Sequence, residues 1–351
     1  MKKNTRFAFN AYLQQLARLN GVAVEELSSK FTVEPSVQQT LEDQIQQSAA
    51  FLTLINVTPV TEQSGQLGLG VGSTIAGTTD TTAKEREPVD PTLMVDVEYK
   101  CEQTNFDTVL TYAKLDLWAK FQDFQVRIRD AIVKRQALDR IMIGFNGVKR
   151  AKTSNRSENP LLQDVNKGWL QKIREDAPDH VMGSTTTGGE TTPGAVKVGK
   201  GGEYANLDAV VMDAVNELID VVYQDDDDLV VICGRELLSD KYFPLVNKEQ
   251  ENSEKLAADM IISQKRMGGL QAVRAPFFPP NALLITRLDN LSIYWQEDTR
   301  RRSVIDNPKR DRIENFESVN EAYVVEDYRC AALVENIQIG DFSAAAAETG
   351  A

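Results

Sequence analysis

The side chains that most often perform chemistry in proteins are scarce in this sequence. His180 is the single histidine among 351 residues, and it lies beside a loop rich in Gly and Thr. No Gly-x-Ser-x-Gly, His-Glu-x-x-His or clustered Cys and His pattern accompanies it. A Ser-His-Asp triad, a zinc protease site and a histidine-rich metal centre are therefore nearly excluded.

The thiols and carboxylates give no sharper indication of chemistry. Cys101, Cys233 and Cys330 are far apart and follow no Cys-x-x-Cys spacing, which predicts reduced, buried thiols in a cytosolic setting. The 52 Asp and Glu residues leave carboxylate catalysis open, but no spacing singles out a pair. We expect no catalytic, cofactor-binding or metal-binding residues.

Three other motifs could bind ions or phosphate, and each has a simpler interpretation. Residues 225–228 are consecutive aspartates without the alternating ligands and central Gly of an EF-hand, which favours an acidic turn before a strand. Gly68, Gly70 and Gly72 lead into turn residues rather than a helix, which favours a long exposed hairpin or loop. The arginines at 300–302 are more typical of an intersubunit or solvated charge cluster than of an active site.

A long helical region between residues 106 and 147 would position much of the chain. Its apolar residues recur every seven positions, at Leu110, Leu117, Phe124, Ala131, Leu138 and Phe145, with Phe121, Ile128 and Met142 in a companion row. This stripe predicts one buried helix face lying across a sheet. A single helix of that length would span roughly 60 Å, so we expect two helices that separate near Gln122 and Asp123. Asp123 would cap the second, whose final turn would end at Gly144 or at Asn146-Gly147.

The rest of the chain predicts a mixed α+β protein. Residues 1–31 form a small helical unit, and a polar, Gln-rich helical arm follows; it has too few apolar residues to bury itself. Strands over 53–69 and 93–101 flank the Gly-rich stretch, 161–175 is a helix, and 177–204 is a loop that marks an excursion or a domain seam.

From residue 206 helices and strands alternate. Helices are expected over 207–222, 235–242 and 254–262, and strands over 229–233, 270–275, 282–286, 292–295, 312–313, 322–326 and 333–339. The Ala-rich residues 343–351 predict a disordered tail.

Charge separates the first segment from the remainder. Residues 1–31 contain five basic and two acidic residues, a charge of +3, so the other residues carry −16 of the total of −13. This balance argues against an open basic face for nucleic acid, although a DNA-binding helix-turn-helix at 1–31 stays a weaker alternative to a docking segment. No stretch approaches ~18 uncharged apolar residues, so nothing is expected to cross a membrane.

Several blocks in matching order across nearly the whole chain resemble the major capsid protein of the P2-like tailed bacteriophages. They are Thr5-Arg6-Phe7, Phe9-Asn10-Ala11-Tyr12-Leu13, residues 30–36, Leu115-Asp116-Leu117-Trp118-Ala119, Phe145-Asn146-Gly147-Val148-Lys149-Arg150, and residues 241–250 and 257–266. The resemblance is more specific than any single motif above.

The resemblance implies an α+β fold of the Hong Kong 97 type. Its parts would be a scaffold-interacting propeptide at 1–31, an N-arm at 32–54, an extended loop at 55–100, a peripheral domain with a spine helix at 101–205, an axial domain at 206–299, a return to the peripheral domain at 300–342 and the tail at 343–351. The chain would form pentamers and hexamers of an icosahedral shell in the host cytoplasm, and would remain in the virion around double-stranded DNA that it does not read.

The resemblance also implies three assembly features. An internal scaffold that is also a protease would assemble with the chain, a portal protein would occupy one vertex, and cleavage would fall between Phe31 and Thr32. Two alternatives stay open: an encapsulin-like shell around a protein cargo, and an enzyme with an unrecognised carboxylate site.

Overall fold

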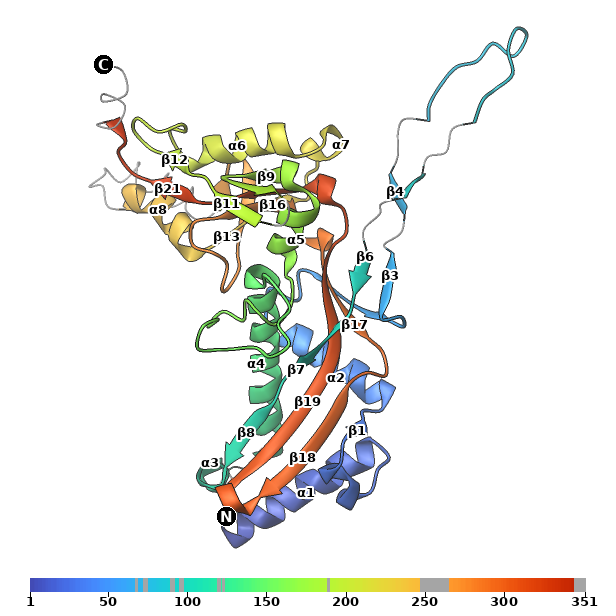
Figure 1. Ribbon diagram of the computed structural model, residues 1–351, viewed down its shortest axis with the longest axis vertical. Coiled ribbons are helices and arrows are strands. Elements are labelled where there is room, and N and C mark those ends of the chain that lie inside the picture. Colours follow the sequence, from blue (N-terminus) through green and yellow to red (C-terminus); the bar gives the residue numbers. More distant parts are fainter. Residues whose placement is uncertain are drawn as a thin grey trace.

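The computed structural model describes residues 1–66, 69–71, 75–88, 92–94, 98–118, 121, 124–187, 190–246 and 265–343. It is an elongated molecule with one sheet at each end and a hairpin that projects from the side (Figure 1). The N-terminus lies at one end, and β21 (Ile337–Ile339), the last strand of the described residues, lies at the other.

The lower half is built on a seven-stranded sheet with the path β1-β18-β19-β17-β2, while β7 and β8 also pair with β19. These strands are β1 (Phe31–Thr32), β2 (Asn56–Val60), β7 (Glu102–Asn105), β8 (Thr108–Thr111), β17 (Leu291–Gln296), β18 (Arg301–Asn307) and β19 (Arg312–Val325). β19 is 14 residues long and pairs with four other strands, so it forms the axis of this half. β17 and β2 run parallel.

Helices cover this sheet. α4 (Phe124–Asn146) lies along it, with α2 (Pro35–Ser48) packed on α4, and α1 (Lys3–Leu19) crosses the lower end (Figure 1). The short helices are the 3-10 turn η1 (Val24–Ser28), α3 (Tyr112–Trp118) and α5 (Trp169–Asp176). The predicted division into two helices is confirmed, since α3 ends at Trp118 and α4 begins at Phe124. Gln122 and Asp123 lie outside the described residues.

The heptad stripe predicts the buried face of these helices only in part. Leu110 lies in β8, Leu117 is 57% exposed and Ala131 is exposed. Ile128, Met142 and Phe145 are buried as predicted, and the buried face of α4 also contains Val133, Gln136, Ala137, Arg140, Ile141 and Ile143. The stripe was misleading because two polar side chains, those of Gln136 and Arg140, belong to the buried face.

The predicted exposed arm is also wrong for α2. Ile45 is fully buried against α4, and Phe51 and Leu52 after the helix join the same core. At the other end of α4 the backbone of Gly144 touches the ring of Trp169, where a Cβ atom would come within 2.2 Å of the ring. The indole of Trp169 donates a hydrogen bond to the Ser292 carbonyl at 2.9 Å. These contacts fix α2, α4 and α5 on the sheet.

The upper half contains a six-stranded sheet with the order β14-β15-β13-β16-β20-β9. Its strands are β9 (Val181–Met182), β13 (Leu229–Cys233), β14 (Arg266–Met267), β15 (Leu270–Arg274), β16 (Leu283–Arg287) and β20 (Ala331–Val334), accompanied by α6 (Leu207–Leu218), α7 (Val221–Gln224) and α8 (Arg235–Val246). One buried cluster contains residues of both sheets, including Ile232, Leu284 and Leu333 above and Ile293 and Tyr323 below. The two halves therefore share a core.

Two strands pair in a different sheet from the one that the expected domain boundaries imply. β17 falls within the segment 206–299 but pairs in the lower sheet, and β20 falls within 300–342 but pairs in the upper sheet. The crossings are close together, because Asn290 donates a hydrogen bond to the Asp327 carbonyl at 2.8 Å. They follow the 3-10 turns η3 (Leu288–Asn290) and η5 (Tyr328–Cys330).

Two further segments differ from their predictions. Residues 177–204 form η2 (Pro178–His180), β9, the hairpin of β10 (Ser184–Thr187) and β11 (Glu190–Pro193), and β12 (Val196–Val198), which pairs with β21 (Ile337–Ile339). They are not a loop at a domain seam. The helix predicted over 161–175 begins only at Trp169, because Leu162 has a φ of 58° that no helix accommodates.

The projecting arm confirms the predicted hairpin within the described residues. β3 (Ser64–Gln66) pairs with β6 (Glu98–Lys100), and β4 (Leu69–Val71) pairs with β5 (Thr92–Met94). The Gly68–Gly72 part of the motif lies mostly outside the described residues, as do the predicted helix at 254–262 and the tail beyond 343. In the part of the chain that is described, no helix is long and apolar enough to cross a membrane.

Candidate functional site

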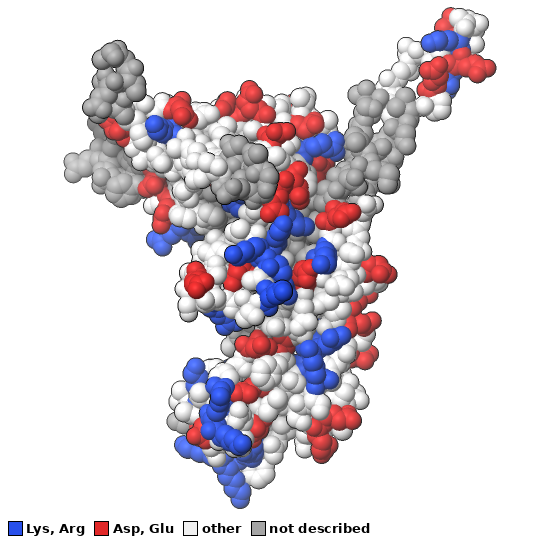
Figure 2. Space-filling model, in the orientation of Figure 1, with Lys and Arg blue, Asp and Glu red and all other residues white. Residues whose placement is uncertain are grey.

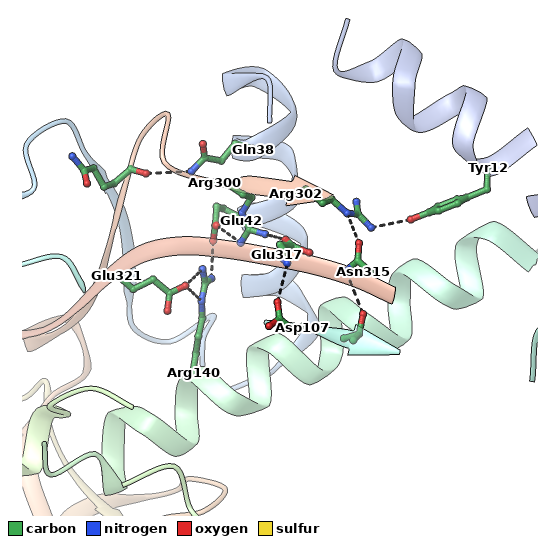
Figure 3. A network of polar contacts seen from close by, with 12 residues as sticks. Tyr12, Gln38, Glu42, Asp107, Arg140, Arg300, Arg302, Asn315, Glu317 and Glu321 are labelled. Carbon is green, nitrogen blue, oxygen red and sulfur yellow. Dashed lines mark hydrogen bonds and ion pairs between the residues drawn. The ribbon is translucent and has the colours of Figure 1, made fainter. Parts of the chain in front are cut away.

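The most unusual feature of the molecule is a network of charged side chains buried where α2, α4 and the lower sheet meet (Figure 3). Glu42 of α2 lies between two arginines: its carboxylate accepts a hydrogen bond from Arg140 at 2.6 Å and another from Arg300 at 2.7 Å. Arg140 also binds Glu321 through its Nε at 2.8 Å, and Arg300 binds Glu317. None of these five side chains is more than 2% exposed.

Burial and charge act in opposite directions on the carboxyl groups of this network. Burial alone would raise the pKa of Glu42 and of Glu317, but the arginines beside them hold both pKa values below the ordinary one. For Glu321, burial raises the pKa, the attraction of Arg140 lowers it and the charge of Glu42 raises it further, so that the pKa ends above its ordinary value. Glu42 is thus held as an anion that joins the arm helix to α4 and to the sheet.

The arginines of 300–302 face the two residues at which cleavage is expected. β1 is the edge strand of the lower sheet, and Phe31 and Thr32 pair with Arg302 and Arg301 of β18. The next residue, Val33, donates its amide to the Arg300 carbonyl at 2.9 Å. The bond between Phe31 and Thr32 therefore lies in a two-residue strand, immediately before a segment that the buried network holds in place.

Segment 1–31 has its own attachments to the sheet. Arg6 forms an ion pair with Asp306 at 2.5 Å, and the Tyr12 hydroxyl accepts a hydrogen bond from Arg302 at 2.9 Å. Phe9 and Leu27 are at most 2% exposed, because they pack in an apolar cluster. The members of this cluster from outside the segment include Leu115, Ile128, Val304 and Ile313. The segment is thus a cap over the lower end of the sheet rather than a separate unit.

Sequence reasoning missed most of the network. The interpretation of residues 300–302 as an exposed or intersubunit charge cluster is wrong for Arg300, whose side chain is fully buried. One signal was available in the arm: Gln38, Glu42, Ile45 and Ala49 recur at helical spacing, which places Glu42 on the same face as the apolar side chains. Arg140 had no comparable signal, since Arg135 and Arg140 look alike in the sequence.

The histidine, the aspartates of 225–228 and the cysteines that the sequence singled out do not belong to this network. His180 lies in η2, and no group of three or more His, Cys, Asp or Glu in the described ranges could hold a metal ion. Asp226 binds Arg287 at 2.9 Å in the turn before β13, which agrees with the predicted acidic turn. The three cysteines are free and buried, as predicted, and burial raises the pKa of Cys101 to about 12.

The face of the molecule in Figure 2 carries both acidic and basic side chains. Acidic side chains line the upper edge over α6 and α7, whereas Lys and Arg gather toward the N-terminal end and at mid-height. An elongated subunit with a projecting hairpin, a long braced helix and an N-terminal cap has the architecture of a shell protein.

The comparisons with known proteins agree with this class. The family model for the phage major capsid protein of the P2 family matches residues 8–337. The capsid protein of Escherichia phage P2 is 59% identical over the full length of both chains, and the major capsid protein of Serratia phage KSP20 is 40% identical over 96% of this chain and 97% of its own. The chain belongs to the P2 family of phage major capsid proteins.

A solved structure supports the same assignment. The chain is similar to a subunit of the satellite phage P4 procapsid that includes the size determination (Sid) protein, with a TM-score of 0.79, 56% identity and coverage of 98% of this chain and all of that one. The fold is the mixed helix-and-sheet fold of Hong Kong 97 type capsid proteins. The protein is a structural component of the virion shell.

Proposed function

We propose that the chain assembles as pentamers and hexamers into an icosahedral shell that encloses double-stranded DNA, with a portal protein at one vertex, and that it catalyses no reaction. The similarity to a procapsid subunit carries this proposal. One chain in both kinds of ring must make head-to-tail contacts that close with different rotations. Each contact can be weak, since many neighbours hold every subunit.

Each part of the fold would have its own role in the shell. The lower sheet with α4 would be the peripheral domain with its spine helix, and the upper sheet would be the axial domain that surrounds each ring axis. The hairpin of residues 55–100 would be the extended loop that reaches a neighbour, with 32–54 as the N-arm. The observed strand pairing supports one change from the sequence boundaries, namely that β17 goes with the peripheral part and β20 with the axial part.

Maturation would remove residues 1–31 by cleavage between Phe31 and Thr32. An internal scaffold that is also a protease would assemble with the chain and make this cut in the host cytoplasm. Two observations support the position: the bond lies in an edge strand, and independent sets of contacts hold the chain on each side of it. Cutting there would separate the cap from the arm without disturbing Glu42.

The test is an intact mass of the chain from fast-sedimenting particles, after co-expression with the gene for the scaffold-protease. A mass corresponding to residues 32–351 would establish assembly and the cleavage position together. Fast-sedimenting particles that contain only the full-length chain would refute the cleavage and leave the shell function intact. A chain that stays slow-sedimenting under these conditions would contradict scaffold-assisted assembly.

A further inference from the structure

The apolar side chains of the cap (residues 1–31) pack into a core that continues across the expected cleavage bond. Those of Phe9, Leu16, Ala17 and Leu27 are at most 8% exposed. They share one buried cluster with side chains of α3, α4, β18 and β19, namely Leu115, Ile128, Val304 and Ile313. All members of this second group follow Thr32 in the sequence. The cap is therefore bound to the rest of the chain by burial of apolar surface, in addition to the peptide bond.

Polar contacts join the cap to the rest of the chain along the whole length of α1. Near the start of this helix, Arg6 pairs with Asp306 at 2.5 Å, and in its middle the Tyr12 hydroxyl accepts a hydrogen bond from β18. Just beyond its end, the side-chain oxygen of Asn20 accepts a hydrogen bond at 3.2 Å from the amide of Glu34, on the other side of the expected cut. Net charge acts in the same direction, because the cap carries +3 and the remainder −16.

Hydrolysis of the bond between Phe31 and Thr32 would break none of these contacts. It would remove the tether, which keeps the cap at a high effective concentration beside its site. After the cut, the cap would be a separate peptide retained by its own contacts. A departing cap would also uncover Leu115, Ile128 and Val304, and exposing buried apolar side chains to water costs free energy. The contacts therefore favour a peptide that stays in place.

We propose that the lower end of the sheet is a peptide-binding site, and that residues 1–31 stay bound there after they have been cut from the chain. The inference rests on the proposed function, from which it takes the cleavage bond. Cleavage and release are then two separate events. The cut separates the cap from the arm, and the peptide leaves only when the contacts of α1 with the sheet open, as a later step of maturation.

The test uses the fast-sedimenting particles that form when the full-length chain is co-expressed with an active scaffold-protease. The particles are washed by sedimentation and resuspended. Mass spectrometry then measures, at a series of times, how much of the peptide of residues 1–31 still sediments with the shortened chain. Three variants are compared with the unaltered chain. Phe9→Ala truncates a buried side chain of α1, Tyr12→Phe removes only the hydroxyl that binds Arg302, and Phe7→Ala truncates a side chain that is 63% exposed.

Freshly washed particles of the unaltered chain should hold the peptide and the shortened chain in about equal numbers. Differences in affinity between variants of one interface fall mostly on the dissociation rate. Phe9→Ala should therefore accelerate loss of the peptide at least roughly a hundredfold, which is the effect of truncating a buried Phe. Tyr12→Phe should accelerate it roughly tenfold, because a hydrogen bond to a charged group is lost. Phe7→Ala should keep the rate of the unaltered chain.

Particles of the unaltered chain that contain the shortened chain but no peptide would overturn the proposal. An equal rate of loss from the unaltered chain and all three variants would also overturn it, since the shell would then retain the peptide by enclosure and not by binding. If Phe9→Ala prevents assembly, Tyr12→Phe still decides between these outcomes. Particles that contain only the full-length chain would refute the proposed cleavage itself, and the bound peptide with it.

Discussion

At the scale of single residues, Glu42 determines how the arm is held. Removing its charge leaves Arg140 and Arg300 buried, each with one remaining carboxylate. Breaking a buried ion pair typically costs about 3–5 kcal/mol, because a charge stays buried without its partner. We therefore expect Glu42→Gln to lower the free energy of unfolding of the unassembled chain by about 3–5 kcal/mol, measured by urea denaturation.

A surface ion pair on α4, the helix that carries Arg140, provides the control. Arg135 binds Asp139 one turn away, and its side chain is 55% exposed. Because solvent screens such a pair, Asp139→Asn should cost less than about 1 kcal/mol. Equal losses for the two variants would mean that the buried network contributes no more than a surface contact does.

The same network should make stability depend on pH. The pKa values of Glu42 and Glu317 are lowered in the folded chain by the neighbouring arginines, against burial. Such groups contribute stability above the ordinary carboxyl pKa of 4.5, and the contribution is lost as pH falls through the folded pKa. The raised pKa of Glu321 acts in the opposite sense, since its protonation stabilises the folded chain as pH falls.

With two lowered groups against one raised group, we expect the free energy of unfolding to decrease as the pH falls below 4.5. Glu42→Gln should make this decrease smaller, because one of the two titrating groups is gone. Urea denaturation of both chains at a series of acidic pH values measures the slopes. Identical slopes would show that Glu42 does not titrate differently in the two states.

Single residues were also where sequence reasoning was weakest. Residues 300–302 are all arginine, so the sequence does not distinguish them. Arg300 is nevertheless buried beside Glu42, whereas Arg302 binds Tyr12. Their different environments come from helices that are distant in the sequence, since Glu42 lies 258 positions from Arg300 and Tyr12 lies 290 positions from Arg302. Local spacing carries no information about such partners, so burial of Arg300 could not be predicted.

At the scale of elements, α1 acts as a cap held by a few buried side chains. Phe9 is 2% exposed in the cluster with Leu115 and Ile128, whereas Phe7 on the same helix is 63% exposed. Truncating a buried Phe to Ala typically costs about 3–5 kcal/mol. We expect Phe9→Ala to free α1 from the sheet and to accelerate amide hydrogen exchange throughout residues 3–19.

Phe7→Ala is the matched control and should leave this exchange unchanged. Amides of α4 and β19 should keep their protection in both variants, because the shared core holds these elements without α1. If Phe9→Ala also accelerated exchange in α4, the cap would be part of the main cooperative unit rather than a separable element.

Helices and strands were predicted well where the local pattern of apolar residues determines the secondary structure. The fully buried β13 lies where an apolar run predicted a strand, and α6 and α8 begin at the predicted residues. The prediction failed for residues 177–204, where Gly, Thr and Ser indicated a loop but β9 and β12 pair with the distant strands β20 and β21. Composition describes a strand poorly when its partner supplies most of the stabilisation.

At the scale of the whole molecule, the proposed role as a container for DNA makes a demand on the net charge of the chain. Removing residues 1–31 would change the net charge from −13 to −16, since the segment carries +3. Binding to DNA depends on cations that displace counterions from phosphates, and the observed affinity falls with salt in proportion to the phosphates neutralised. A more acidic chain after maturation would enclose the packaged genome without binding its phosphates tightly. Weak binding would favour both packaging and release of the DNA.

We expect the cleaved chain, dissociated from purified shells, to show no measurable affinity for a short DNA duplex at about 50 mM salt, where electrostatic binding is strong. Fluorescence anisotropy of a labelled duplex provides the measurement, and the full-length chain is the comparison that isolates the basic segment. Binding by the cleaved chain that weakens steeply with added salt would reveal a basic surface that the net charge conceals. The shell would then bind the DNA that it encloses, and release of the genome would have to break those contacts.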